Sequence, residues 1–159
     1  MTPNGFRRIA DRVQEHINSL PDTTDIILII LKGHLLIEEE MNRMIEIVFQ
    51  KPQHILKKNF SFYKKLCVLR AKNTQTGNCR GLWDIIETIN NIRNNIAHHL
   101  SPRDLSSKLG QLFRKIENSN SEYRSYVDPS WDEARHVRED LGYVVAVVAG
   151  LSDRLSESN

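Results

Sequence analysis

The fold is decided by residues 26–50, which read IILIILKGHLLIEEEMNRMIEIVFQ. Large side chains recur in this stretch at alternating spacings of three and four residues, at Ile30, His34, Ile37, Met41, Met44 and Val48. This spacing is typical of a long α-helix that packs one face into the seam of a helical bundle. The polar run 22–25 before it can cap the helix, and Pro52 ends it. The sequence therefore predicts a helix from about residue 26 to about Gln50.

Further helices are predicted on both sides of this one, over residues 6–20, 60–71, 81–97, from Ser101-Pro102 to about 118, and 131–155. Pro21 ends the first, and a Ser cap followed by proline begins the fifth. The helix over 81–97 carries a stripe of isoleucines at 85, 89, 92 and 96. We find no strand pattern and no internal repeat. We expect an all-α, antiparallel helical bundle with short loops, forming a single domain over residues 1–159.

Composition places the chain in the ordinary globular class, because 40% of its 159 residues are hydrophobic and 26% are charged. The longest apolar run, residues 26–31, is far shorter than the roughly 20 residues that a bilayer requires. No apolar run follows Arg7 and Arg8, so no leader is expected. Two cysteines, Cys67 and Cys79, form neither a disulfide framework nor a four-ligand zinc site. We expect a cytoplasmic protein with no membrane contact.

The net charge of +2 hides a strong asymmetry. Residues 51–80 contain eight Lys or Arg and no Asp or Glu, so this basic stretch carries +8 and the remainder −6. Three aromatic residues lie within it, and a basic groove with aromatic platforms suits single-stranded RNA. A solvated basic face, with the aromatics in the core of a short helix, is the alternative. The residues expected to contact RNA are Lys57, Lys58, Lys64, Lys65 and Arg70.

The segment Arg93-Asn94-Asn95-Ile96-Ala97-His98-His99 ends the isoleucine-striped helix. A guanidinium that holds phosphate oxygens, beside an imidazole that moves protons near neutral pH, is the minimum apparatus for cleaving RNA without a metal. At about 100° per residue, Arg93 lies about 80° from the isoleucine stripe and His98 about 140° further round, with Asn94 between them. Because this separation is too wide to grip one phosphate, we expect two copies to meet across a two-fold axis and share one groove.

Cations near a helix C-terminus also have a purely structural interpretation, since they interact favourably with the helix dipole. His99 falls close to the isoleucine stripe and is expected to cap the helix or border the core beside the site. His34 and Glu38 are four residues apart and can satisfy each other as a buried polar pair. Alternatively, Glu38 faces the motif helix and orients Arg93 or His98.

Metal chemistry of the di-iron type requires two Glu-x-x-His repeats, and only Glu133 and His136 have that spacing. No glycine-rich phosphate loop, nucleophile elbow or His-Glu-x-x-His motif is present. We therefore expect neither a metal nor a cofactor.

The pattern Arg93-Asn94-x-x-x-His98 resembles the Arg-x(4 to 6)-His signature of the HEPN superfamily (higher eukaryotes and prokaryotes nucleotide-binding domain). The similarity spans roughly residues 23–102, and includes the segments 31–43, 62–66 and 82–92. The Arg-Asn-x-x-Ala-His form is also similar to that of mannitol-repressor-like relatives.

This resemblance implies a four-helix core with extra helices, a homodimer with the motif at its interface and, in active members, a metal-independent endoribonuclease. His98 would act as general base or acid, Arg93 would stabilise charge on phosphorus, and Asn94 would orient one of them. The product would be a 2',3'-cyclic phosphate. Active members are often toxins paired with an antitoxin, or phage-defence components. The alternative is a catalytically inactive HEPN module that binds RNA or a protein partner, as a regulator.

Overall fold

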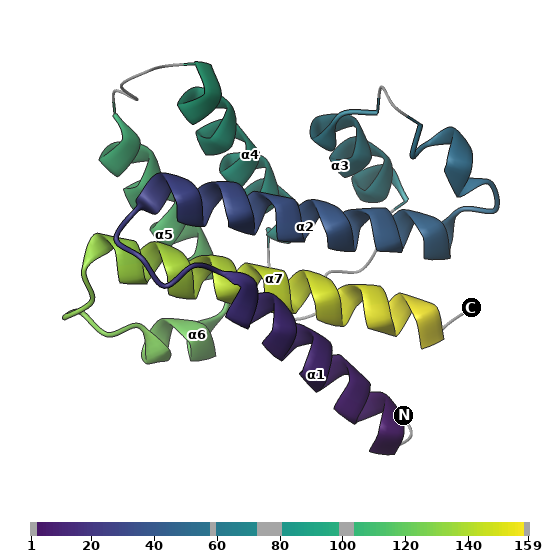
Figure 1. The fold of residues 1–159 in the computed structure, drawn as a ribbon, viewed down its shortest axis with the longest axis horizontal. Helices are drawn as coiled ribbons and strands as arrows, with labels where there is room; N and C mark the ends of the chain where they lie inside the picture. The colour runs from purple at the N-terminus through teal and green to yellow at the C-terminus, as the bar shows by residue number, and fades with distance from the viewer. Residues whose placement is uncertain (1–2, 58–59, 73–80, 99–103, 158–159) are drawn as a thin grey trace.

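The structure is a computed structural model that describes residues 3–57, 60–72, 81–98 and 104–157 (Figure 1). Within these ranges every regular element is helical: α1 (Pro3–Ser19), α2 (Ile26–Val48), a 3-10 turn (Pro52–His54), α3 (Phe62–Ala71), α4 (Leu82–His98), α5 (Leu105–Ser119), α6 (Ser121–Tyr126) and α7 (Glu133–Glu157). The expected all-α helical bundle is confirmed.

Helix α2 forms as its sequence predicts. The Asp25 carboxylate accepts a hydrogen bond from the Leu28 backbone N–H and so caps the first turn, and Phe49 leaves the helix in an extended conformation. The predicted stripe is buried, with Val48 partly covered at its end. The stripe therefore faces the core, as its periodicity indicates.

The core of the bundle is the contact between α2 and α7, which lie side by side in Figure 1. Gly33 lies against Leu141, and Arg43 against Asp153, so the two helices run in the same direction. The apolar run of α7 supplies fully buried side chains to this contact, at Leu141, Val144, Val145 and Val148. Helix α1 crosses α7 obliquely and packs mainly against it.

Helix α4 packs against α2, α3 and α5. Its isoleucines at 85, 86, 89 and 92 are at most 1% exposed, and Ile96 is partly covered. Figure 1 shows α4 rising away from α2, with its C-terminal end at the edge of the molecule. This packing brings the predicted motif to an accessible end of the bundle.

The structure differs from the prediction in one element and in small shifts at several helix ends. The segment after residue 119, expected as an irregular connection, contains α6, whose first turn is capped by the Asn120 side chain. Among the described residues, helix α5 begins at Leu105, directly after Asp104, whose left-handed φ of 63° lies outside the helical range. The predicted start at Ser101-Pro102 and most of the expected polar loop over 72–78 lie outside the described residues.

Among the helices that the structure describes, none combines the length and the apolar character needed to span a bilayer.

Candidate functional site at the end of helix α4

The three motif residues lie in the last two turns of α4. His98 is the final helical residue and is exposed, whereas Arg93 and Asn94 are half-buried. Arg93 Nη1 donates a hydrogen bond of 3.1 Å to Asn94 Oδ1. This bond limits the positions open to the guanidinium and leaves its other N–H groups to bind an anion. His99 lies outside the described residues.

His34 lies behind this end of α4. Its ring is buried, stacks on Phe62 of α3 at a centroid separation of 4.1 Å, and donates through Nε2 to Asn90 Oδ1 at 3.2 Å. Burial lowers the pKa of His34, and the positive charge of Arg93 lowers it further, against opposing contributions from Asn90 and Glu38. The ring is therefore neutral at pH 7, and Arg93 is close enough to influence it.

Glu38 has a different partner from the one considered in the sequence. Its Oε1 forms an ion pair of 2.7 Å with Lys65 Nζ of α3, and His34 instead bonds to Asn90. The two residues are thus satisfied separately, by partners on α3 and α4. Lys65 is only 8% exposed, so this lysine is not available as a surface cation.

Asn90 is a site residue that the sequence analysis missed. It is 5% exposed and lies one turn before Arg93 on α4. The available signal is its polar amide among the isoleucines of the helix, immediately after Ile89, where an apolar residue is more usual.

The basic stretch is partly neutralised in three dimensions. Arg70 pairs with Asp84 and Glu87 of α4. Lys57 and Lys64 are exposed and form no ion pair with the residues that the structure describes, while Lys58 lies outside them. Of the three aromatics, Phe62 is buried, Phe60 is partly buried and Tyr63 is 50% exposed. Two of the expected cations, Lys65 and Arg70, are therefore neutralised by acidic side chains in the part of the stretch that the structure describes.

An apolar strip on α2 borders the flank that carries His34. Leu28, Leu31 and Leu35 recur at intervals of three and four residues, and we call them the leucine strip. Leu28 is 48% and Leu35 58% exposed, and Leu31 is half-buried. Leu28 and Leu35 are two of the large hydrophobic side chains that are exposed among the described residues, and such strips commonly mark contact surfaces.

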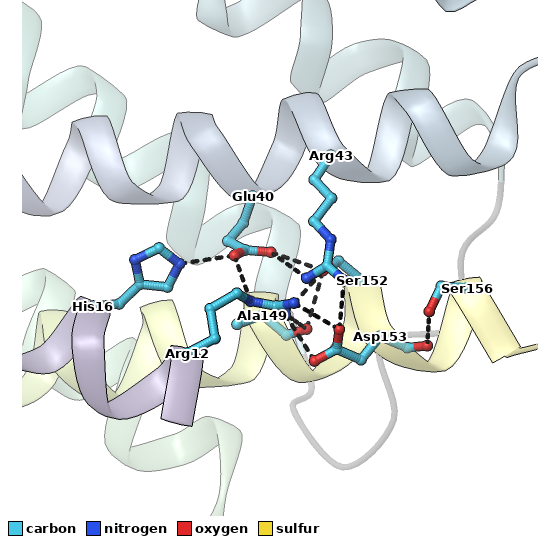
Figure 2. Close-up of polar contacts among 8 residues, drawn as sticks. All are labelled: Arg12, His16, Glu40, Arg43, Ala149, Ser152, Asp153 and Ser156. Carbon is cyan, nitrogen blue, oxygen red and sulfur yellow. Dashed lines mark hydrogen bonds and ion pairs between the residues drawn. The ribbon is translucent and has the colours of Figure 1, made fainter. Parts of the chain in front are cut away.

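A second polar cluster joins α1, α2 and α7, and Figure 2 shows its contacts. We call it the Arg12 network. Arg12 donates to both carboxylate oxygens of Asp153, at 2.8 and 2.7 Å, and its Nε lies 3.1 Å from Glu40. Glu40 also accepts from His16 and Ser152, at 2.8 and 2.7 Å. Arg43 completes the network through Asp153 at 2.9 Å.

A hollow of about 600 Å³ lies beside the Arg12 network, between α1 and α2. The buried charges that border it are paired, so the two guanidinium groups are already engaged by carboxylates. The network therefore fastens α1 to the bundle, and we assign it a structural role.

The chain was compared with protein-family models, curated proteins and solved structures, and no match was found in any of the three comparisons. The class supported by the coordinates is an all-α bundle with an arginine, asparagine and histidine at the accessible end of one helix.

Proposed function

We propose that this protein is a metal-independent endoribonuclease of the HEPN type, which cleaves RNA through attack of the 2'-hydroxyl on the adjacent phosphorus. The observation that carries the proposal is the position of Arg93, Asn94 and His98 on one accessible helix end, with Arg93 held by Asn94 at 3.1 Å. Arg93 would hold the phosphate and stabilise its developing charge, and His98 would transfer protons. The expected products carry a 2',3'-cyclic phosphate.

The active form would be a homodimer. Arg93 and His98 are separated by about 140° around one helix, so a second copy completes the groove. The leucine strip supports this arrangement, because an exposed apolar surface lies next to the His34 flank of α2, which contacts α4 beside Arg93. We propose that the protein acts in the cytoplasm, as a toxin controlled by an antitoxin or as a phage-defence nuclease.

Incubation with end-labelled single-stranded RNA in the presence of chelator tests the proposal. We expect the wild type to cut, and Arg93→Ala and His98→Ala each to reduce cutting at least about 100-fold, the usual loss for a proton-transfer or charge-stabilising group. Asn91→Ala is the matched control, since Asn91 is exposed on the same helix.

A wild-type protein that binds RNA and leaves it intact would overturn the nuclease proposal in favour of the second candidate, a HEPN module that binds RNA or a protein partner. The exposed cations Lys57 and Lys64 favour that candidate, since they can contact phosphates without any chemistry.

A further inference from the structure

The helical wheel places Asn90 in the gap between the two reactive groups. Relative to Asn90, Arg93 lies about 60° to one side and His98 about 80° to the other, with Asn94 about 40° away on the His98 side. Asn90 sits one turn below Arg93 and two turns below His98. Its side chain therefore leaves α4 within the sector that Arg93 and His98 border.

The two ends of this amide have different environments. Oδ1 accepts the hydrogen bond from His34 Nε2, at 3.2 Å. The Nδ2 group has no hydrogen bond to the residues that the structure describes, and it is not among their fully buried atoms without a partner, although the side chain as a whole is only 5% exposed. A buried amide normally uses its donors, and a donor that lacks a protein partner at the edge of a site is available to a ligand oxygen.

We propose that Asn90 is a further substrate-binding residue, whose Nδ2 group donates to a non-bridging oxygen of the phosphodiester held by Arg93, and that His34 is a positioning residue which fixes the orientation of this amide. The inference rests on the proposed function and names a third phosphate contact of the same site. A preorganised donor stabilises developing negative charge without reorganising during the reaction.

The surroundings of His34 support its role. Its ring cannot turn freely, because Phe62 stacks against one face at 4.1 Å. Glu38, the acidic neighbour one turn away, is occupied by Lys65 at 2.7 Å. Asn90 is therefore the group that holds the Nε2 proton of His34, and the hydrogen bond leaves the NH2 end of the amide turned away from His34.

Asn90→Asp tests the substrate contact, with Asn91→Asp as its control. Both changes add one negative charge to α4, but Asn91 is exposed. At position 90, the carboxylate still accepts from His34 and loses the NH2 donor, so RNA cleavage should fall at least about 100-fold. Cleavage by Asn91→Asp should stay within about three-fold of the wild type. Helical content and the unfolding midpoint establish that each variant is folded, and Asn90→Ser serves as a smaller, uncharged second variant with the same expected loss.

A binding measurement separates this inference from the nuclease proposal. A 2'-O-methyl oligoribonucleotide cannot be cut, and its addition to 15N-labelled protein should shift the Asn90 side-chain amide resonances, which are assigned by their absence in Asn90→Asp. A wild type that leaves RNA intact while these resonances shift would overturn the nuclease and support the Asn90 contact. A wild type that cuts RNA without a shift, together with an Asn90→Asp variant of undiminished activity, would overturn the contact alone.

The positioning role of His34 has its own readout. A glutamine in place of His34 can still offer an N–H to Asn90, whereas a leucine cannot. We expect His34→Gln to cleave RNA within about five-fold of the wild-type rate. His34→Leu should cleave at least about ten-fold more slowly than His34→Gln. Equal activity of the two folded variants would show that His34 only fills space.

Discussion

Gly33 is the residue at which α2 and α7 approach most tightly. A Cβ at this position would lie 2.7 Å from Leu141 Cδ1 and 3.3 Å from its Cβ, which the fully buried leucine cannot avoid by rotating. Gly33→Ala should therefore lower the free energy of unfolding by roughly 1–3 kcal/mol, as overpacking does.

The matched control for Gly33 is Gly150 in α7, where an added Cβ meets nothing within 4 Å. Gly150→Ala should leave the stability unchanged or raise it by about 0.5–1 kcal/mol, because alanine favours the helix. Urea unfolding of both variants measures the difference. Equal midpoints would show that the close contact at Gly33 is not needed.

Asp140 is a buried carboxyl that should make stability depend on pH. It is fully buried in α7 and accepts a hydrogen bond of 2.7 Å from the Tyr123 hydroxyl of α6. Burial raises its pKa to about 7. The groups around it are His136 at 3.7 Å, Glu117 of α5 and Glu139. Its other oxygen, Oδ2, has no hydrogen-bond partner among the described residues.

The sign of the pH effect follows from the raised pKa. Between the ordinary value of 3.8 and about 7, the folded protein holds a proton that the unfolded chain has lost, so the stability supplied by Asp140 falls as the pH rises through this range. An asparagine in its place would still accept from Tyr123 but cannot titrate.

Urea unfolding of the wild type and Asp140→Asn between pH 4 and 8 tests this. The wild-type stability minus that of the variant should decrease up to about pH 7 and then level off. Burial lowers the pKa of His136 in both proteins. In the variant, where no Asp140 contribution opposes it, stability should therefore rise as the pH approaches 6.5. A difference that stays constant across the range would show that Asp140 is ionised in the fold.

Candidate catalytic residues can be predicted from sequence when they lie on one helix, because their spacing then determines their relative positions. Arg93, Asn94 and His98 lie in the last two turns of α4, where His98 is exposed and the other two are half-buried. The partners of His34 and Glu40 are not predictable in this way, because Asn90 lies 56 residues and Ser152 112 residues away along the chain. Such pairs depend on how α2 packs against α4 and α7, which periodicity does not specify.

At the scale of helices, the sequence predicts long elements well and short ones poorly. The long helices carry stripes over several turns, and the structure contains all of them, with small differences at their ends. Helix α6 has only six residues, too few for a periodic pattern, and it depends on the Asn120 cap and on burial of Tyr123. The basic stretch shows the same limit, because the acids that pair with Arg70 belong to α4.

The Arg12 network joins helix α1 to α2 and α7 (Figure 2). Arg12→Met should lower the free energy of unfolding by roughly 2–4 kcal/mol, below the usual maximum for a buried ion pair because the Arg12 side chain is 23% exposed. The loss arises because Glu40 and Asp153 stay buried with fewer partners. Hydrogen exchange should accelerate in α1 more than in α4.

Gln14→Met is the control for this prediction. Gln14 lies on the exposed side of α1, where its Nε2 donates a hydrogen bond of 2.9 Å to Asn18 Oδ1. Its replacement should change stability by no more than about 0.5 kcal/mol. Equal effects of the two substitutions would show that α1 is held by its apolar contacts alone.

At the scale of the whole molecule, the sequence predicts a helical bundle but not the relative directions of its helices. Helices α2 and α7 are the longest elements and run in the same direction, although strict up-and-down alternation through the four α-helices between them would make them antiparallel. Antiparallel packing is the default only for neighbours joined by short loops. The order in which distant helices pair is a property of the assembled core.

The proposed dimer makes a prediction about the leucine strip. Leu35→Asp would place a charge on its most exposed member, so it should convert a dimer into a monomer. RNA cleavage should then fall in proportion to the fraction of dimer that is lost. Tyr126→Asp introduces the same charge at a side chain that is 62% exposed on α6, and should leave the dimer intact. Analytical ultracentrifugation measures both. A variant that remains dimeric after the Leu35 change would place the interface elsewhere.

A mixing experiment distinguishes a shared groove from two independent sites. Arg93→Ala and His98→Ala subunits should each be inactive alone. In the mixed dimer one subunit still supplies the guanidinium and the other the imidazole, so a groove built across the two-fold axis regains both groups. Random exchange makes about half of the dimers mixed, and each mixed dimer keeps one of the two Arg93–His98 pairs around the shared groove, so activity should return toward roughly a quarter of the wild-type level. Two sites confined to single subunits would stay silent, because no subunit in the mixture carries both residues.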